Sequence, residues 1–210
     1  MNYRSGATLR VLVDIDGTLY DMRPTVCALM NEFYNLNLSI ADITDWDFSR
    51  SLLDHQQYQH FITYGLHRDA TIAAAAPFAD AAGVLRSWRK AGAAIHVVTH
   101  RAQARRGATR DWLERHGIPF DELVCHPFVD KFHYAASRGL NLVIDDKPAL
   151  LEQCVRAGIS AATIAYPYNQ KFLEDFPQIL GAASWSEIEE RLDLEVLAQA
   201  RDIAAQSLTL

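Results

Sequence analysis

Four short apolar segments, separated from one another by helical or loop sequence, constrain the fold of this chain more than any other feature. They span residues 10–15, 94–99, 141–144 and 161–165, and a fifth, weaker one spans 122–125. Each is rich in Val, Ile or Leu, which is typical of strands buried in a parallel sheet. Alternation of such strands with helices predicts an α/β fold, a Rossmann-like open parallel sheet with helices on both faces.

Glycines mark the ends of the intervening helices. One predicted helix covers Asp80–Ala91 and ends at Gly92, and another covers Arg106–His116 and ends at Gly117. Glycine directly after a helical run suits the left-handed residue that terminates a helix. Near the end of the chain, the segment 186–189 fits a capping box before a helix that runs to about residue 205.

The interval from Tyr20 to residue 76 breaks the alternation. It contains helical stretches at Pro24–Tyr34 and His55–Gly65, joined by a polar turn region, and Pro77 restarts the main pattern. We therefore expect a small helical cap, residues 20–76, inserted after the first strand. Residues 1–19 and 77–210 would form the core domain.

Composition limits the partners and the compartment. The chain has 210 residues and a formal net charge of −6, which disfavours binding to a nucleic acid polymer. Cys27, Cys125 and Cys154 are odd in number and lack metal-ligand spacing, so we expect reduced thiols in a cytoplasmic protein. No apolar stretch approaches membrane-spanning length, so we expect no membrane association.

The first strand ends in two carboxylates, Asp14 and Asp16, followed by Gly17. On an extended chain, residues i and i+2 point to the same side, so both carboxylates reach toward one point. Gly17 permits a sharp turn directly after them. Two converging carboxylates are costly unless a cation neutralises them or one holds a proton. The pair predicts a metal site with an acid/base partner, although helix capping is an alternative.

Polar residues follow the other strands where those strands end. Thr99, His100 and Arg101 follow one strand, Asp145 and Asp146 follow another, and Lys131 precedes the latter strand. Ligands of open parallel sheets bind at the carboxyl ends of the strands, so we expect these groups to converge. One hydroxyl, one ammonium and four carboxylates there would suit a phosphoryl group with Mg²⁺, which prefers oxygen ligands.

The order Asp-x-Asp-Gly-Thr, hydrophobic-Thr, Lys and Asp-Asp resembles the haloacid dehalogenase (HAD) superfamily of phosphatases. The matching residues are Asp14–Thr18, Val98-Thr99, Lys131 and Ile144–Asp146, within residues 8 to 168. The helical insert and the run Ile144-Asp145-Asp146-Lys147-Pro148 are most similar to the 5′(3′)-deoxyribonucleotidase group.

The resemblance implies a Mg²⁺-dependent phosphomonoester hydrolase with an aspartyl-phosphate intermediate. Asp14 would be the nucleophile and Asp16 the acid and base, so we expect the environment of Asp16 to raise its proton affinity relative to that of Asp14. Thr99 would donate its hydroxyl to a phosphoryl oxygen, and Lys131 would neutralise charge. The resemblance implies a Mg²⁺ site formed by Asp14, the Asp16 backbone carbonyl and the acidic pair, with Asp146 a direct ligand and Asp145 acting behind it or through water.

Substrate contacts are expected from five further residues: Tyr20, Trp46, Phe48, His100 and Arg101. Arg101 would grip a phosphate or sugar hydroxyl with its forked guanidinium, or else pair with a surface carboxylate. Trp46 and Phe48 lie in a loop rather than at helical spacing, so they are candidates for stacking on a nucleobase, as in the related nucleotidases, although packing within the insert is an alternative.

The substrate predicted is a small phosphorylated metabolite, with nucleotides as the first candidate and sugar phosphates as the alternative. A phospho-receiver domain also gathers Asp, Thr and Lys around Mg²⁺, but its phosphorylated Asp has no Asp two residues later. A non-catalytic binding domain is a further alternative, although no motif residue is missing. Asp16 argues against haloacid dehalogenation. Monomer and homodimer both remain open.

Overall fold

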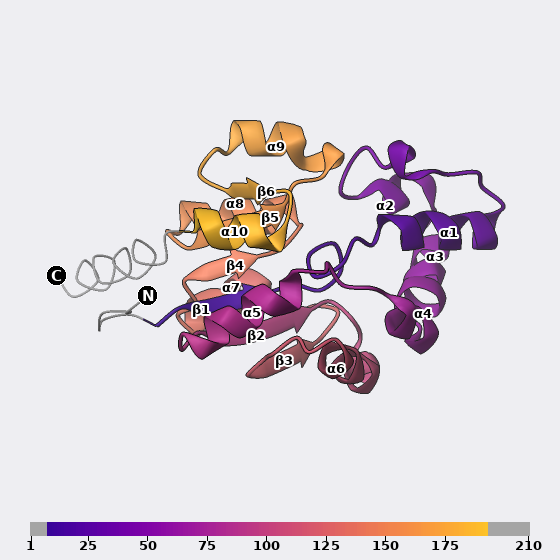
Figure 1. The fold of residues 1–210 in the computed structure, drawn as a ribbon. Helices are drawn as coiled ribbons and strands as arrows, with labels where there is room; N and C mark the ends of the chain where they lie inside the picture. Colours follow the sequence, from indigo (N-terminus) through magenta and orange to yellow (C-terminus); the bar gives the residue numbers. More distant parts are fainter. Residues whose placement is uncertain (1–7, 193–210) are drawn as a thin grey trace.

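The computed structural model describes residues 8–192, which form one six-stranded parallel sheet with helices on both faces (Figure 1). The strand order is β3-β2-β1-β4-β5-β6, and every neighbouring pair is parallel. The strands are β1 (Arg10–Val13), β2 (Ala94–Thr99), β3 (Glu122–Cys125), β4 (Leu142–Ile144), β5 (Ser160–Ile164) and β6 (Leu180–Ala182). The predicted α/β class is confirmed.

The sheet is buried on both faces because its central strands carry mostly apolar side chains. Three of the four β1 residues, Val11, Leu12 and Val13, are fully buried. Their alternating directions supply two hydrophobic clusters, with Val11 and Val13 on one face and Leu12 on the other. This double burial explains why the strands read as continuous apolar runs.

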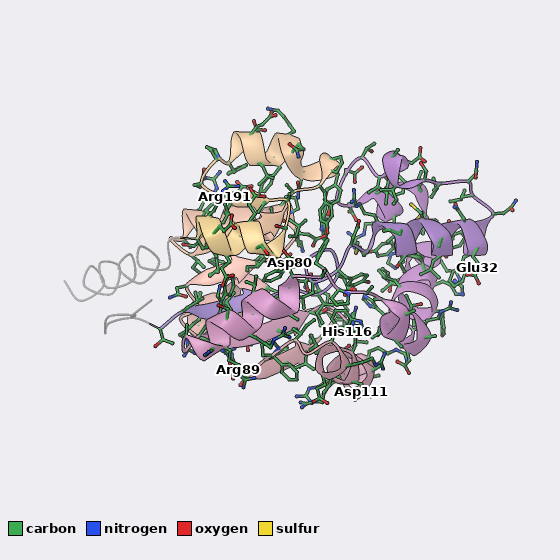
Figure 2. All side chains as sticks on the ribbon, in the orientation of Figure 1. Glu32, Asp80, Arg89, Asp111, His116 and Arg191 are labelled. Carbon is green, nitrogen blue, oxygen red and sulfur yellow. The ribbon has the colours of Figure 1, made fainter. Side chains whose placement is uncertain are left out.

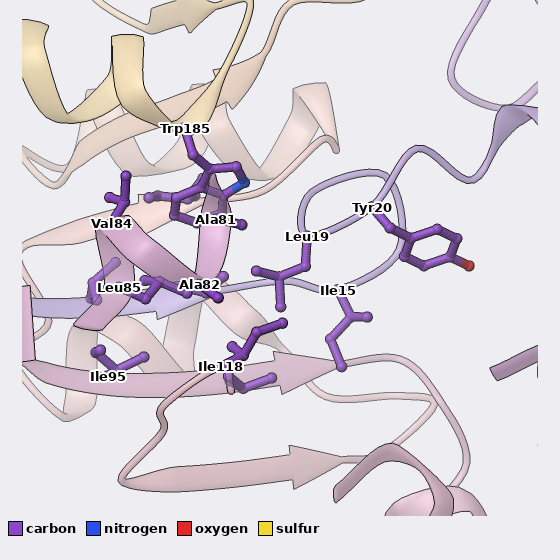
Figure 3. Close-up of a cluster of buried hydrophobic side chains, with 14 of the residues drawn as sticks. Ile15, Leu19, Tyr20, Ala81, Ala82, Val84, Leu85, Ile95, Ile118 and Trp185 are labelled. Atoms are coloured by element: carbon purple, nitrogen blue, oxygen red, sulfur yellow. The ribbon is translucent and has the colours of Figure 1, made fainter. Parts of the chain in front are cut away.

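The first face of the sheet holds the largest side chains. Trp88, Trp112 and Trp185 are buried there, and Figure 3 shows Trp185 with Leu85, Ile15 and Leu19 in the same cluster. The helices on this face are α5 (Ala81–Lys90), α6 (Arg106–Arg115) and α10 (Trp185–Arg191). The opposite face is covered by α7 (Lys131–Ser137), α8 (Pro148–Arg156) and α9 (Gln170–Asp175).

The helical insert lies at the carboxyl ends of the strands (Figure 1). Its elements are α1 (Arg23–Tyr34), the 3₁₀ turn η1 (Ile40–Asp42), α2 (Phe48–Leu52), α3 (His55–His60), the π-helical turn η2 (Phe61–Leu66) and α4 (Asp69–Ala74). A separate cluster around Met30 and Phe61 forms the core of the insert. Glu32 on α1 lies far from Arg89 and Arg191 of the sheet layer (Figure 2).

The last helix of the insert belongs to a different cluster from the rest. Ile72 of α4 and the following Ala75 pack in the main cluster of the sheet layer, and Trp112 Nε1 donates to the Ala75 carbonyl at 2.7 Å. The division into a core and a cap at residues 20 and 76 therefore stays a prediction, since α4 packs against α6 of the core.

Three local expectations differ from the structure. A sixth strand, β6, is present where the sequence has only Leu-Gly-Ala. The predicted helix at His55–Gly65 continues one residue further and changes to a π-helical turn at Phe61. The cap of α10 is Ser184, whose Oγ accepts from the Glu187 N–H, rather than Ser186. The predicted extension of this helix toward residue 205 lies outside the described residues.

Short connecting turns complete the chain between strands, namely η3 (Gln103–Arg105) after β2 and η4 (Pro167–Asn169) after β5. Within residues 8–192, no helix combines the length and apolar character that a membrane crossing requires.

Candidate active site

The turn after β1 brings the first acidic residues to the edge of the sheet. β1 ends at Val13, and the backbone N–H of Asp14 continues the pairing by donating to the Ile144 carbonyl of β4 at 2.9 Å. Gly17 then adopts a φ of +83°, and a Cβ at this position would collide with the carboxylate of Asp146. Glycine is therefore required both for the backbone conformation and for the close approach of Asp146.

Lys131 joins the ends of β1 and β4. Its Nζ lies 2.7 Å from Oδ1 of Asp14 and 2.7 Å from Oδ2 of Asp145, and all three residues are buried. Lys131 is the first residue of α7, which is capped by Asp130 through a hydrogen bond from the His133 N–H. The capped helix start thus fixes the backbone position from which Lys131 reaches both carboxylates.

Asp145 and Asp146 have different surroundings. Both Asp145 oxygens accept from the protein, Oδ2 from Lys131 and Oδ1 from the Lys147 N–H at 2.8 Å. Asp146 Oδ2 accepts from the Tyr168 hydroxyl at 3.3 Å, and the indole of Trp46 lies beside the same carboxylate. Asp146 thus has more capacity left for another ligand than Asp145 has.

The three carboxylates Asp14, Asp145 and Asp146 fit a metal ion. Each offers one oxygen, and these oxygens lie within 4.8 Å of one another. When all three carboxylates are ionised they carry three negative charges. The ammonium of Lys131, which contacts two of them, balances one charge, so two negative charges remain. Burial, with Asp145 as an added negative neighbour, raises the pKa of Asp14 and of Asp146, although Lys131 opposes the rise. A buried, oxygen-lined site with excess negative charge is suited to a divalent cation.

Asp16 is held in a different way from Asp14. Arg101 donates from Nε to Asp16 Oδ2 at 2.9 Å and from Nη2 to Oδ1 at 2.8 Å, and the Tyr20 hydroxyl donates to Oδ1 at 2.8 Å. His67, which follows η2 of the insert, places Nε2 3.8 Å from Oδ2. Burial by itself would raise the pKa of Asp16, but the charge and hydrogen bonds of Arg101 outweigh it and hold that pKa below its usual range.

The environments of Asp14 and Asp16 therefore differ, but in the opposite sense to the expectation that Asp16 holds a proton more tightly than Asp14, because the bidentate guanidinium of Arg101 stabilises the ionised form of Asp16. The pKa of Asp14 is raised and that of Asp16 is lowered, although the residues are two positions apart. An ionised Asp16 is the form that accepts a proton.

Thr99 and His100 follow β2 at the same edge. Thr99 is buried, and its Oγ1 accepts from the Arg101 backbone N–H at 3.3 Å. The Nε2 of His100 lies 3.1 Å from the Val129 carbonyl, in the loop before α7, so this side chain contacts the chain itself. Of the predicted substrate contacts, His100, Tyr20 and Arg101 thus each have protein partners in the structure.

The aromatic residues of the insert line a small cavity at the edge of the site. Trp46 is 36% exposed and Phe48 is buried in the core cluster of the insert. Both line a cavity of about 30 Å³, whose wall also includes Tyr166 and Tyr168 from the loop after β5. These two tyrosine rings stack with their centroids 5.1 Å apart.

A larger surface cavity of about 550 Å³ lies elsewhere, along α6 and β3, among residues that include Arg106 and Glu122. It is lined by none of the predicted site residues and is therefore separate from the acidic cluster.

Sequence reasoning did not identify His67 or Tyr168 as site residues. His67 follows an apolar helical segment, and Tyr168 follows a strand that carries no motif. Neither has a spacing signal that would distinguish it from an ordinary packing residue.

Residues 8–201 match the model of the family described as 5′ nucleotidase, deoxy (pyrimidine), cytosolic type C protein (NT5C). The chain belongs to this NT5C family. The match spans the strand ends that carry Asp14, Thr99 and Asp146, as well as the helical insert.

Relatives of this NT5C protein agree with the assignment. A Bacillus cereus protein named "Putative nucleotidase" is 26% identical over 192 residues, which cover 87% of this chain and 97% of the relative. A solved HAD family hydrolase from Deinococcus radiodurans R1, which holds phosphate and sodium, aligns with a TM-score of 0.63 and 17% identity over 93% of this chain and 97% of its own.

The fold by itself does not define the activity. The Protein Tyrosine Kinase A of Mycobacterium tuberculosis aligns with a TM-score of 0.65 and 16% identity, over 90% of this chain and 99% of its own. The NT5C family match decides between these activities. The resemblance to HAD phosphatases and to the deoxyribonucleotidase group is confirmed, and this NT5C protein is a phosphomonoester hydrolase that acts on small phosphorylated substrates.

Proposed function

We propose that the protein is a Mg²⁺-dependent nucleotidase that hydrolyses nucleoside monophosphates through an aspartyl-phosphate on Asp14. The observation that carries this proposal is the buried set of Asp14, Asp145 and Asp146 around Lys131, at the carboxyl edge of the sheet and beneath the insert. Membership of the NT5C family supports the nucleotide as substrate.

Asp14 would act as the nucleophile. Its Oδ1 lies on Lys131, and within the described residues no hydrogen bond to its Oδ2 is present. That oxygen would attack phosphorus as the bond to the leaving oxygen breaks, and the electron pair of this bond would stay on the leaving oxygen. Lys131 would neutralise charge on the phosphoryl oxygens and on Asp14.

Asp16 would move the proton in both steps. In the first step, its protonated form would protonate the leaving oxygen. In the second step, its carboxylate would take a proton from the water that attacks the aspartyl-phosphate and releases phosphate. The lowered pKa of Asp16 in this arrangement favours the second of these roles.

Thr99 would orient the phosphoryl group. Because its Oγ1 already accepts from the Arg101 N–H, its own hydrogen is available to a phosphoryl oxygen.

The acidic residues would hold the cation. Asp14, Asp146 and the backbone carbonyl of Asp16 are the proposed ligands, and Asp145, with both oxygens occupied, would act behind them. Mg²⁺ would supply neutralisation of the phosphoryl charge and of the Asp14 carboxylate. Oxygen-only donors favour Mg²⁺ over softer metals.

Trp46 and Phe48 are the proposed base-recognition residues. They line the small cavity between the insert and the loop after β5, next to Asp146. Because this cavity is too small for a nucleobase in the present arrangement, the insert would move away from the strand ends to admit one.

We also propose that the protein works in the cytoplasm. Cys27, Cys125 and Cys154 are all buried as free thiols, as is usual in a reducing compartment.

The decisive experiment is a turnover screen of the purified protein against nucleoside monophosphates, sugar phosphates and other phosphomonoesters, with Mg²⁺ and with a chelator. We expect Mg²⁺-dependent release of phosphate with preference for nucleotides, and none from the Asp14→Asn variant. Preference for sugar phosphates would replace the nucleotidase assignment. Activity retained by Asp14→Asn would overturn the proposed nucleophile.

A further inference from the structure

Arg101 is the most deeply buried charged side chain at the edge of the site. It is 0% exposed, its guanidinium lies 6.0 Å from the ring centroid of Trp112, and its Nη1 lies 3.5 Å from Thr109 Oγ1. A buried guanidinium is costly unless it is paired. Its partner is Asp16, and the pairing is bidentate.

The arrangement fixes both oxygens of Asp16. Oδ1 accepts two hydrogen bonds, from Arg101 and from Tyr20, whereas Oδ2 accepts one, from Arg101. An ionised carboxylate offers about four acceptor positions, so the position that remains is on Oδ2. His67 of the insert lies on the side of this oxygen.

Arg101 also contacts a second residue of the site. Its backbone N–H donates to Thr99 Oγ1 at 3.3 Å. One residue therefore holds the carboxylate of Asp16 with its side chain and the hydroxyl of Thr99 with its backbone.

We propose that Arg101 is a positioning residue that orients Asp16 so that Oδ2 is the atom that gives and takes the proton. Tyr20 assists by occupying Oδ1. Neither residue then binds the substrate, in contrast to the contact expected from the sequence. The inference rests on the proposed role of Asp16 in phosphomonoester hydrolysis.

The test compares two substrates whose leaving groups differ in whether they must be protonated as they depart. The leaving alkoxide of an alkyl phosphate must be protonated, whereas p-nitrophenolate leaves without a proton. We compare kcat/KM, which reports only the formation of the aspartyl-phosphate, because the second step is the same for both esters. We expect Arg101→Lys, which retains the charge but loses the fork, to lower kcat/KM for the alkyl ester by about 10²-fold. The loss of kcat/KM for p-nitrophenyl phosphate should be at least about tenfold smaller, since general acid catalysis contributes little to the departure of p-nitrophenolate.

Tyr20→Phe provides a second variant in case Arg101→Lys does not fold. It removes one hydrogen bond to Oδ1 but retains the ring, which lies 6.1 Å from Trp112. We expect the same selective loss on the alkyl ester, smaller in size. Arg110→Lys on exposed α6 and Tyr64→Phe on the exposed side of the insert are matched controls, and both should behave as the wild type.

A double variant separates positioning from general structural damage. If Arg101 acts through Asp16, adding Arg101→Lys to Asp16→Asn should lower kcat no further. An equal loss of kcat/KM on both esters, an effect confined to KM, or additive losses in the double variant would each overturn the inference. The wild type and Asp14→Asn test the proposed function separately: an inactive wild type, or an active Asp14→Asn, contradicts the function itself.

Discussion

The ammonium of Lys131 lies 2.7 Å from Oδ1 of Asp14, in a region where both side chains are buried. The same ammonium lies 2.7 Å from Asp145, so it connects the ends of β1 and β4. Within residues 8–192, Lys131 is the only positively charged side chain that the structure shows in contact with the acidic cluster of Asp14, Asp145 and Asp146.

Replacing Lys131 with Met should therefore leave the buried carboxylates of Asp14 and Asp145 without a positively charged partner. We expect turnover of p-nitrophenyl phosphate to fall by at least about 10²-fold, because charge stabilisation at the phosphoryl group is lost. We also expect the metal-free protein to lose about 3–5 kcal/mol of unfolding free energy, as measured by denaturant titration. Mg²⁺ should restore part of this stability.

Lys171→Met is the matched control for that variant. Lys171 also makes a 2.7 Å ion pair, with Asp175, but on the exposed surface of α9. Such exposed pairs contribute little, so both activity and stability should stay close to the wild type. Equal effects of the two substitutions would contradict the special role of the buried ammonium.

Stability of the metal-free protein should depend on pH through the acidic cluster. Burial and negative neighbours raise the pKa of Asp14 and Asp146 above the unfolded value of about 3.9. A raised carboxyl pKa favours the folded state below the unfolded pKa, and this contribution is lost as pH rises through the folded pKa. Asp16 has a lowered pKa, so its contribution is lost only in acid, below that window.

Mg²⁺ should reverse this dependence because it binds the ionised carboxylates. We expect a larger rise of the melting temperature with Mg²⁺ at about pH 8 than at about pH 5.5, measured by thermal unfolding with and without chelator. Asp146→Asn should reduce the difference between the two pH values. The same Mg²⁺ effect at both pH values in the wild type would show that these groups do not titrate in this range.

Gly17→Ala should damage the site from the backbone. The positive φ disfavours any side chain, and the new Cβ would collide with Asp146. We expect a loss of about 1–3 kcal/mol in unfolding free energy and weaker Mg²⁺ binding, the latter measured by calorimetry. Gly83→Ala in α5, where an added Cβ meets nothing within 4 Å, should instead preserve or raise stability. An unchanged Mg²⁺ affinity in Gly17→Ala would contradict the proposed role of Asp146.

Trp46→Ala tests the recognition of the base. If Trp46 stacks on a nucleobase, kcat/KM for nucleoside monophosphates should fall about 5- to 150-fold, as expected for the loss of one stacking contact. The loss for a small aryl phosphate should be much smaller. Tyr64→Ala, which removes an aromatic ring that is 62% exposed on the insert, should leave kcat/KM unchanged for both substrates. Equal losses on both substrates after Trp46→Ala would exclude base stacking.

Phe48 requires a different expectation from Trp46. Because Phe48 is buried in the core of the insert, Phe48→Ala should lower stability by about 3–5 kcal/mol as well as affect turnover. Chemical denaturation monitored by tryptophan fluorescence measures this loss. If Phe48→Ala were as stable as the wild type, the ring would not be needed for packing of the insert, and a role in substrate contact would be favoured.

The strands of the sheet were largely predictable because each central strand is buried on both faces. Burial on both faces requires an apolar side chain at almost every position, and this is visible as a continuous run in the sequence. β6 was not predicted because it has only three residues and one of them is Gly181, which gives no strand pattern. The structure shows why a glycine lies there: Leu173 of α9 fills the space where a Cβ would lie.

The site was predictable only in part. Asp14 and Asp16 do not lie on one extended strand, since β1 ends at Val13, the chain bends at Ile15 and the turn begins at Gly17. The two carboxylates consequently meet different cations, Lys131 and Arg101. For Arg101, the sequence allowed a substrate or a surface carboxylate as partner, and the observed partner is the partly buried Asp16.

The sequence by itself determined the order of the strands along the chain, the carboxylates at their ends and the family, because these depend on residue type and local spacing. Only the tertiary structure decided which charge meets which partner, and that His67 and Tyr168 lie at the acidic groups. Such pairings join residues far apart in the sequence and depend on how burial strengthens each interaction, and neither property leaves a local pattern.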